Sequence, residues 1–162
     1  LPAAVDFAAG CAMAPVPALK AQTAWLEKKI EAGAEFVLTQ PLFTVSDFDA
    51  LEKACAHLPA TIFAGIFPIV SARQAVFLKS GKIPGIVPPD TIVKRLAEFD
   101  DPADQAKAGL EETRSLLRSM AGRAAGFYLI MPFHKNAALW SAELVRFIKT
   151  ELPQTRPSHN TV

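Results

Sequence analysis

Short apolar runs alternate with amphipathic helical segments along this 162-residue chain, and this alternation limits the possible fold more than any other feature. The apolar runs are about five to seven residues long, which is the length of a strand, and the segments between them repeat apolar residues with helical spacing. Strands that alternate with helices form parallel βαβ units. We therefore predict an α/β fold with four strands, at residues 3–9, 35–39, 61–67 and 126–131.

Helix start and stop signals flank these strands. Gly33 ends the first predicted helix, and Ser46 is the predicted N-cap of the second, because its hydroxyl can accept from free backbone NH groups. Pro102 occupies the first position of another helix, and Asn136 is the predicted cap of the last. The predicted helices cover residues 46–57, 71–79, 90–99 and 101–120, together with one that begins near Leu19 and one that begins at Asn136.

Four βα units make half of an eight-unit barrel, whose complete form needs about 250 residues. An open, doubly wound sheet is the alternative. The chain has neither GxGxxG after its first strand nor GxxxxGK[ST] anywhere, which are the phosphate-binding loops of open sheets. We therefore predict half of a TIM (β/α)8 barrel, as one domain over residues 1–152. Residues 153–162 are polar and contain proline, which is typical of a disordered tail or a linker.

The composition excludes several classes of partner. The formal net charge is +1, so no long-range field attracts nucleic acid or an anionic membrane. The most apolar stretch, residues 61–70, is shorter than the roughly twenty residues that span a bilayer, so we expect no membrane segment. Cys11 and Cys55 lie far apart without metal-ligand spacing, which favours free thiols, no metal site and a cytoplasmic location. The start Leu-Pro-Ala-Ala has no signal-peptide pattern and suggests a piece of something longer.

Gln40 is the main candidate for ligand binding that the strand pattern provides. In parallel α/β folds, ligands bind beyond the carboxyl ends of the strands. Polar groups there are scarce in this chain, since Pro68 and Pro132 follow the third and fourth predicted strands. A glutamine offers a carbonyl acceptor and two NH donors, so it can pair with the lactam edge of a pterin or flavin. A structural role, in which Gln40 ties the strand end to a neighbouring loop, is equally compatible with the residues alone.

Four ordered blocks of sequence resemble the methylenetetrahydrofolate reductase family of flavin-dependent barrels. The first is LEKKIEAGAEFVLTQP at residues 26–41, and the others are GIFP at residues 65–68 with the following SARQA, IPGIVP at residues 83–88, and GFYLI at residues 126–130. The resemblance covers roughly residues 7–150. It looks closest to the reductase module of bifunctional homocysteine S-methyltransferase/methylenetetrahydrofolate reductase, and it implies that the chain is the C-terminal half of the barrel.

The resemblance implies an oxidoreductase that holds FAD. In that family NADH or NADPH passes a hydride to the flavin, which then reduces 5,10-methylenetetrahydrofolate to 5-methyltetrahydrofolate for one-carbon metabolism and methionine supply. The implied partners are the folate substrate and either the missing N-terminal half of the barrel or a second subunit. We also expect a homo-oligomer.

The family's site residues match individual positions of this sequence. Gln40 resembles the glutamine that binds the pterin ring and also faces the nicotinamide, and Gln74 resembles a second substrate-contacting glutamine. Leu78, or its neighbour Phe77, falls where an aromatic residue stacks on the substrate. The implied cofactor contacts are Lys28 and Lys29, a basic pair for the flavin phosphates, and Tyr128, an aromatic beside the cofactor.

The sequence also departs from the family. Pro132 stands near the place of a substrate-binding arginine, for which His134 or Lys135 is a possible substitute. The family's acid catalyst, a glutamate, and its flavin-ring aspartate belong to the first half of the barrel, so we assign no catalytic residue in this chain.

Two other functions remain open at this point. One is a half barrel that binds folate or flavin without turnover and needs a partner to close it, because four strands leave two open edges. The other is a different barrel enzyme, such as an aldolase or a dihydropteroate-type transferase. Such enzymes usually need a Schiff-base lysine or a phosphate loop at a strand end, and no lysine ends a predicted strand here.

Overall fold

A computed structural model describes residues 7–15, 18–132 and 134–153 of the chain. Its centre is a four-stranded sheet in which every neighbouring pair of strands is parallel and the spatial order follows the chain, β1-β2-β3-β4. The strands are β1 (Gly10–Met13), β2 (Phe36–Pro41), β3 (Thr61–Ile66) and β4 (Gly126–Leu129). The predicted α/β class is confirmed.

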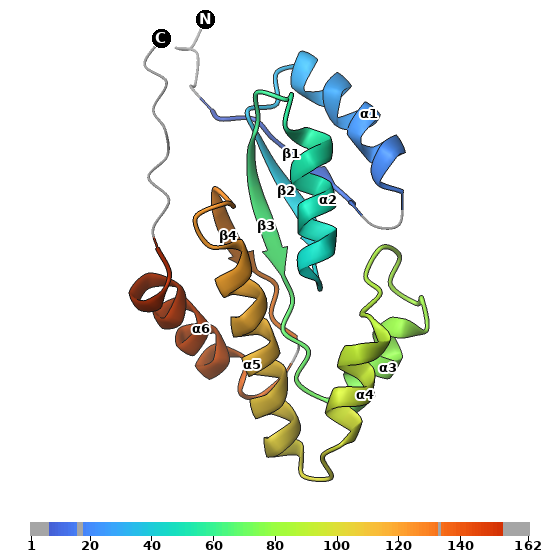
Figure 1. Ribbon diagram of the computed structural model, residues 1–162, viewed down its shortest axis with the longest axis vertical. Helices are drawn as coiled ribbons and strands as arrows, with labels where there is room; N and C mark the ends of the chain where they lie inside the picture. The colour runs from blue at the N-terminus through green and yellow to red at the C-terminus, as the bar shows by residue number, and fades with distance from the viewer. Residues whose placement is uncertain (1–6, 16–17, 133, 154–162) are drawn as a thin grey trace, which may run out of the picture.

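Helices connect the strands as a βα succession requires. They are α1 (Leu19–Glu31), α2 (Val45–Cys55), α3 (Ala72–Lys79), α4 (Asp90–Ala97), α5 (Pro102–Met120) and α6 (Ala137–Glu151). Three of them, α3, α4 and α5, separate β3 from β4. Figure 1 shows the pair α3 and α4 beyond the carboxyl end of β3, where α4 also contacts α5.

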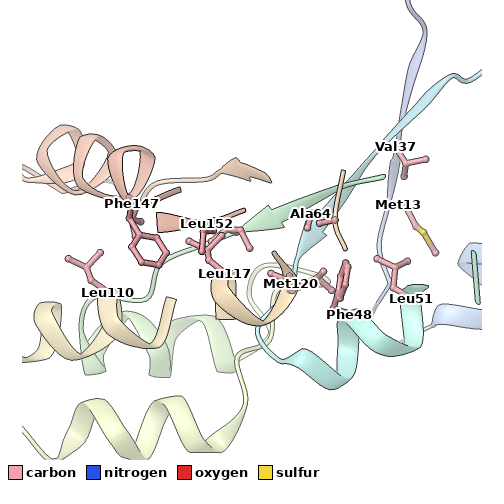
Figure 2. Close-up of a cluster of buried hydrophobic side chains, with 14 of the residues drawn as sticks. Met13, Val37, Phe48, Leu51, Ala64, Leu110, Leu117, Met120, Phe147 and Leu152 are labelled. Atoms are coloured by element: carbon pink, nitrogen blue, oxygen red, sulfur yellow. The ribbon is translucent and has the colours of Figure 1, made fainter. Parts of the chain in front are cut away.

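The main core lies between the sheet and four of the helices. The strands contribute buried residues such as Met13, Val37 and Ala64 to this core. The helices α1, α2, α5 and α6 contribute Leu26, Leu51, Leu117 and Leu144, respectively. Figure 2 shows Phe48 and Leu51 of α2 beside Met120 and Leu117 of α5, with Phe147 of α6 further along the same layer. A second, smaller core of Ile69, Ala75, Leu78 and Leu96 joins α3 to α4.

Side chains of successive strand residues point to opposite faces of the sheet, so the neighbours of the core residues Val37 and Ala64 lie on the other face. Phe36 and Phe63 meet there edge to face, with ring centroids 6.1 Å apart. Gly10 and Gly126 flank the two rings, and a Cβ atom at Gly10 would lie 2.2 Å from the Phe36 ring. Leu38, on the same face, is 37% exposed.

This one-sided arrangement distinguishes a half barrel from a doubly wound sheet. A doubly wound sheet has helices on both faces and a reversal in strand order, whereas a barrel keeps its strands in chain order and its helices on the outside. The sheet has the barrel arrangement, with β1 and β4 as its two edges. The prediction of four βα units from a half barrel is thereby confirmed.

The prediction of the first strand at residues 3–9 was wrong for residues 7–9, the part that the structure describes. Residues 1–6 lie outside the described part of the chain, residues 7–9 are not a strand, and β1 begins at Gly10. Gly10 is the partner of Phe36 in the β1–β2 ladder, and a Cβ atom there would lie against the Phe36 ring. The alanine-rich run before Gly10 is about as apolar as β1 itself, so apolar character alone does not fix where the strand begins.

Two predicted caps need correction. The N-cap of α2 is Thr44, whose hydroxyl accepts from the backbone NH of Asp47 at 3.1 Å, while Ser46 lies inside the helix. Asn136 does hold the N-cap position of α6, but its side chain makes no capping bond, and its backbone NH donates to Nδ1 of His134 at 3.1 Å. Smaller differences concern strand and helix ends, since α2 stops at Cys55 and β4 at Leu129.

The remaining expectations concern the thiols, the bilayer and the tail. Cys11 and Cys55 are free thiols. In the described ranges no helix has both the length and the apolar character that a bilayer crossing requires. The predicted tail falls almost wholly on residues 154–162, outside the described part of the chain.

Candidate functional site

A bulge near the carboxyl end of β2 sets the position of Gln40. Leu38 pairs with Phe63, but the next pairing joins Pro41 to Gly65, so Thr39 and Gln40 stand opposite Ala64 alone. After the bulge the ladder resumes, with the NH of Leu42 donating to the carbonyl of Gly65 at 3.0 Å. Bulges turn a side chain away from the regular alternation and are frequent beside active sites.

Hydrogen bonds from two other strands hold this bulge. The backbone NH of Gly65 donates to the hydroxyl of Thr39 at 2.9 Å, and the hydroxyl of Tyr128 donates to the carbonyl of Thr39. Thr39 is fully buried. Burial raises the pKa of the Tyr128 hydroxyl above its usual 10, so at neutral pH this group remains a donor.

Gly65 makes the contact between Tyr128 and Thr39 possible. It is the partner of Tyr128 in the β3–β4 ladder and lies between β2 and β4. A Cβ atom at Gly65 would lie 2.5 Å from the carbonyl oxygen of Thr39 and 2.8 Å from the hydroxyl of Tyr128. A side chain at this position would therefore separate the tyrosine from the bulge.

The amide of Gln40 lies under the loop between α3 and α4. Its Oε1 atom is the single buried side-chain oxygen or nitrogen without a hydrogen-bond partner in the described part of the chain. Gly85 of this loop lies against it, since an added Cβ there would be 1.9 Å from this Oε1. A buried carbonyl without a donor costs about 1–3 kcal/mol, so Oε1 of Gln40 contributes no hydrogen bond to stability in this position.

The structure places Gln74 on the first turn of α3, beyond the end of β3. Its Oε1 accepts from the backbone NH of Val70 at 2.9 Å, which ties the side chain to the segment that leaves β3. The hydroxyl of Ser71 caps the same helix by accepting from the NH of Gln74. No described residue accepts from the Nε2 group of Gln74, so its NH donors are the part that a ligand could use.

Leu78 and Phe77 differ in exposure on α3. Leu78 is 2% exposed and packs against α4 in the smaller core, whereas Phe77 is 46% exposed with the ammonium of Lys82 5.6 Å from its ring centre. Of the two, Phe77 is the one with a ring surface that a planar ligand can reach. The sequence pattern alone did not separate them, because neighbouring helix positions differ by only about 100° in direction.

Lys28 and Lys29 lie in the last turn of α1. The ammonium of Lys28 is 4.9 Å from the centre of the Trp25 ring, and that of Lys29 donates to the carbonyl of Ala12 in β1 at 2.6 Å. Neither forms an ion pair with a carboxylate of a described residue. Both charges are therefore available to an anion, although Lys29 would have to leave Ala12.

Lys29 also covers part of the open edge of β1. The carbonyl of Ala9 accepts from Glu35 on the β2 side. Backbone groups of successive strand residues point to opposite sides, so the carbonyl of Ala12 points away from β2. The NH of Ala14 on this same side donates to Oε1 of Gln22, at 3.4 Å. Side chains of α1 thus occupy backbone groups that a further strand would use.

His134 and Lys135 follow β4 and line a cavity of about 470 Å³ with Ser71, Asp101 and Trp140. The imidazole of His134 stacks on Trp140 with ring centroids 4.5 Å apart, and its Nδ1 accepts from Asn136. These contacts give His134 a structural role at the start of α6. Gln40 lies at the carboxyl end of β2, whereas this cavity is lined by residues that follow β3 and β4.

The sequence did not point to Thr39, Gly65 or Gly85 as parts of a site. Gly65 and Gly85 each fall inside a block of the family resemblance, which was the only available signal. In the described residues no group of three or more His, Cys, Asp or Glu side chains could hold a metal ion. The surroundings of Gln40 described above consist of its amide, Gly65, Gly85 and Tyr128.

Comparisons with known proteins give the chain a family context. The model of the methylenetetrahydrofolate reductase family matches residues 7–137. A protein of Caenorhabditis elegans named "Probable methylenetetrahydrofolate reductase (NADPH)" is 30% identical over 156 residues, which covers 85% of this chain and 23% of that protein. The chain thus spans about a quarter of that relative.

A solved structure shares the fold. It is described as an uncharacterized protein from Clostridium thermocellum that binds two copies of 5-methyl-5,6,7,8-tetrahydrofolic acid. It matches with a TM-score of 0.60 at 17% sequence identity and covers 86% of this chain and 52% of that chain. The chain described here is thus similar to about half of a larger protein.

Proposed function

This chain belongs to the methylenetetrahydrofolate reductase family, and on that premise we propose that it supplies the folate-binding half of a flavin-dependent reductase barrel. The substrate would be 5,10-methylenetetrahydrofolate and the product 5-methyltetrahydrofolate. The observation that carries the proposal is the amide of Gln40, aimed by a bulge at the carboxyl end of β2 and left with a buried, unpartnered Oε1.

The chemistry of a pterin suits this amide. The lactam edge of the ring displays an NH donor next to a carbonyl acceptor, and a glutamine amide displays the complementary acceptor and donors. A ligand NH that reaches Oε1, with a small movement of the loop at Gly85, would recover the hydrogen bond that the carbonyl lacks. Water offers the same donor less selectively, so shape and the paired donor and acceptor provide the specificity.

Two further side chains extend the proposed folate site. The NH donors of Gln74 lie at the start of α3, and the exposed ring of Phe77 on the same helix offers a stacking surface. Leu78, which the resemblance also indicates, would act from beneath by packing α3 against α4. We propose that the folate meets Gln40, Gln74 and Phe77, with Leu78 as their support.

The residues present fit the FAD that the family implies. Lys28 and Lys29, neighbours in α1, carry ammonium groups that pair with no carboxylate of the described residues, and two such cations are suited to phosphates. The ring of Tyr128 lies on the inner face of the sheet, while its hydroxyl is occupied by Thr39. The flavin, when bound, would carry a hydride from NADH or NADPH to the folate. The part of these residues is to bind the cofactor and to hold Gln40 in place.

The second candidate function is a half barrel that binds folate or flavin without turnover. One observation favours it: the four described strands contain no aspartate or glutamate, so no carboxyl group on them could protonate the folate. A proton donor would have to come from another segment or subunit. The two functions share the Gln40 site and differ only in whether that donor is added.

Binding and turnover measurements separate these functions. We expect the purified chain to bind 5-methyltetrahydrofolate in a calorimetric titration, and to bind FAD with a change in flavin absorbance. Oxidation of NADH or NADPH by methylenetetrahydrofolate would support the reductase, whereas binding without turnover would support the second function. A chain that bound neither FAD nor folate would contradict both.

A further inference from the structure

The loop over Gln40, residues 80–89 between α3 and α4, is closed at its base by an ion pair. The ammonium of Lys79, at the end of α3, pairs with the carboxylate of Asp90, at the start of α4. Within the loop, Gly81 and Gly85 both have positive φ angles, of 74° and 78°. Only glycine adopts this conformation without strain, so both positions are restricted by backbone geometry.

The two glycines differ in their surroundings. A Cβ atom at Gly81 would have nothing within 4 Å, whereas one at Gly85 would lie 1.9 Å from Oε1, 2.9 Å from Cδ and 3.1 Å from Nε2 of Gln40. Every one of these contacts is with the amide of Gln40. The absence of a side chain at Gly85 is therefore what lets the loop lie directly on that amide.

We infer that Gly85 positions the folate-binding amide of Gln40, because the loop that lies on this amide at Gly85 sets its orientation. The inference rests on the proposed function for the identity of the ligand. The contact between Gly85 and Gln40 does not depend on that function, since it is present in the protein alone. Gly85 is a positioning residue: it acts on the ligand through Gln40.

A methyl group at position 85 would turn the amide away. The atoms that it would meet are the far end of a flexible side chain, so Gln40 can rotate to relieve the clash and the loss of stability stays small. The orientation of the amide cannot be kept at the same time. Ligand binding should consequently suffer more than folding does.

Gly81 provides a matched control. Gly81→Ala and Gly85→Ala impose the same positive-φ strain in the same loop, but only the second reaches Gln40. We expect both variants to lower the midpoint of thermal unfolding by a similar amount. Any difference in their ligand binding then reports the contact with Gln40 rather than the backbone.

The first measurement uses the protein without ligand. In a ¹⁵N-labelled chain, the side-chain amide signals of Gln40 are identified by their absence from Gln40→Ala. Those signals should shift in Gly85→Ala and stay at their parental positions in Gly81→Ala. Parental positions in Gly85→Ala would overturn the inference.

The second measurement is the affinity for 5-methyltetrahydrofolate. Gly85→Ala should weaken it about tenfold, the loss expected for one or two hydrogen bonds, whereas Gly81→Ala should leave it unchanged. In a Gln40→Ala background, Gly85→Ala should have no additional effect. Equal affinities of the two glycine variants would overturn the inference. If the parental chain bound no folate, the proposed function would fail, while the amide signals would still decide whether Gly85 orients Gln40.

Discussion

The hydroxyl of Tyr128 donates a hydrogen bond to the backbone carbonyl of Thr39, two strands away, and does so across Gly65 on the strand between them. The bond joins β4 to the bulge of β2, next to Gln40. It connects the last strand with the residue that we propose to bind folate. The site is thus assembled from β2, β3, β4 and the α3–α4 loop.

This bond gives a prediction for the ionisation of Tyr128. It is the single tyrosine of the chain, so a tyrosinate absorbance titration reports this residue alone. Burial raises its pKa above the ordinary value of 10. We expect the folded protein to titrate above pH 10 and the unfolded chain near it. A folded-state titration at the ordinary value would contradict the buried donor.

The same shift predicts how stability changes at high pH. The folded state keeps the proton to higher pH than the unfolded chain, so the unfolded state binds fewer protons between the two pKa values. The contribution of Tyr128 is therefore complete below pH 10 and is lost as the pH rises through the folded pKa. Tyr128→Phe, which loses about 1 kcal/mol with the hydrogen bond at neutral pH, should show less alkaline destabilisation than the parent. Equal pH profiles would exclude the proposed environment.

Replacement of Gly65 tests the close approach of Tyr128 to the bulge. Gly65→Ala brings a methyl group against the backbone oxygen of Thr39, which cannot rotate away, and we expect a loss of roughly 1–3 kcal/mol of unfolding free energy. Gly126→Ala is the control, because its Cβ would meet only the ring of Phe63, 2.8 Å away, on the same face of the sheet. In chemical denaturation, the free energy of unfolding of Gly65→Ala should be lower than that of Gly126→Ala. The reverse order would show that the bulge tolerates a side chain.

Lys29 should limit self-association through the open edge of β1. Its ammonium occupies the outward carbonyl of Ala12, and a lysine on an edge strand hinders pairing with another chain. Lys29→Met removes this cover and should raise the fraction of dimer in sedimentation experiments. Lys28→Met changes the net charge equally but removes only a contact with Trp25. Matching behaviour of the two variants would assign any effect to charge rather than to the edge.

The local elements were predictable from the sequence because their signals are local. Glycine and proline punctuation located α1, α3 and α5, and the apolar runs located β2, β3 and β4 to within a few residues. Gln40 was also singled out as a candidate from the sequence alone, because it follows an apolar run, and its role in binding stays a prediction. These features depend on residues that lie close together in the chain.

The features that the sequence did not reveal depend on partners far away in the chain. The bulge at Thr39 and Gln40 exists only in the pairing of β2 with β3, and the contact of Gly10 with the ring of Phe36 exists only in the pairing of β1 with β2. The contact between Gly85 and the Gln40 amide brings the loop that follows α3 against the end of β2. Hydrophobic pattern carries no information about such contacts, because it records burial and not the identity of the neighbour.

The affinity of Gln40→Ala for folate tests the central proposal most directly. Calorimetric titration of 5-methyltetrahydrofolate into the parental and variant chains should show binding weakened by about tenfold or more in the variant, while FAD binding stays nearly unchanged, because the amide pairs with the pterin ring. Gln22→Ala, on α1, is a control glutamine outside the site. Equal folate affinity in Gln40→Ala and the parent would contradict the proposal that Gln40 binds the pterin.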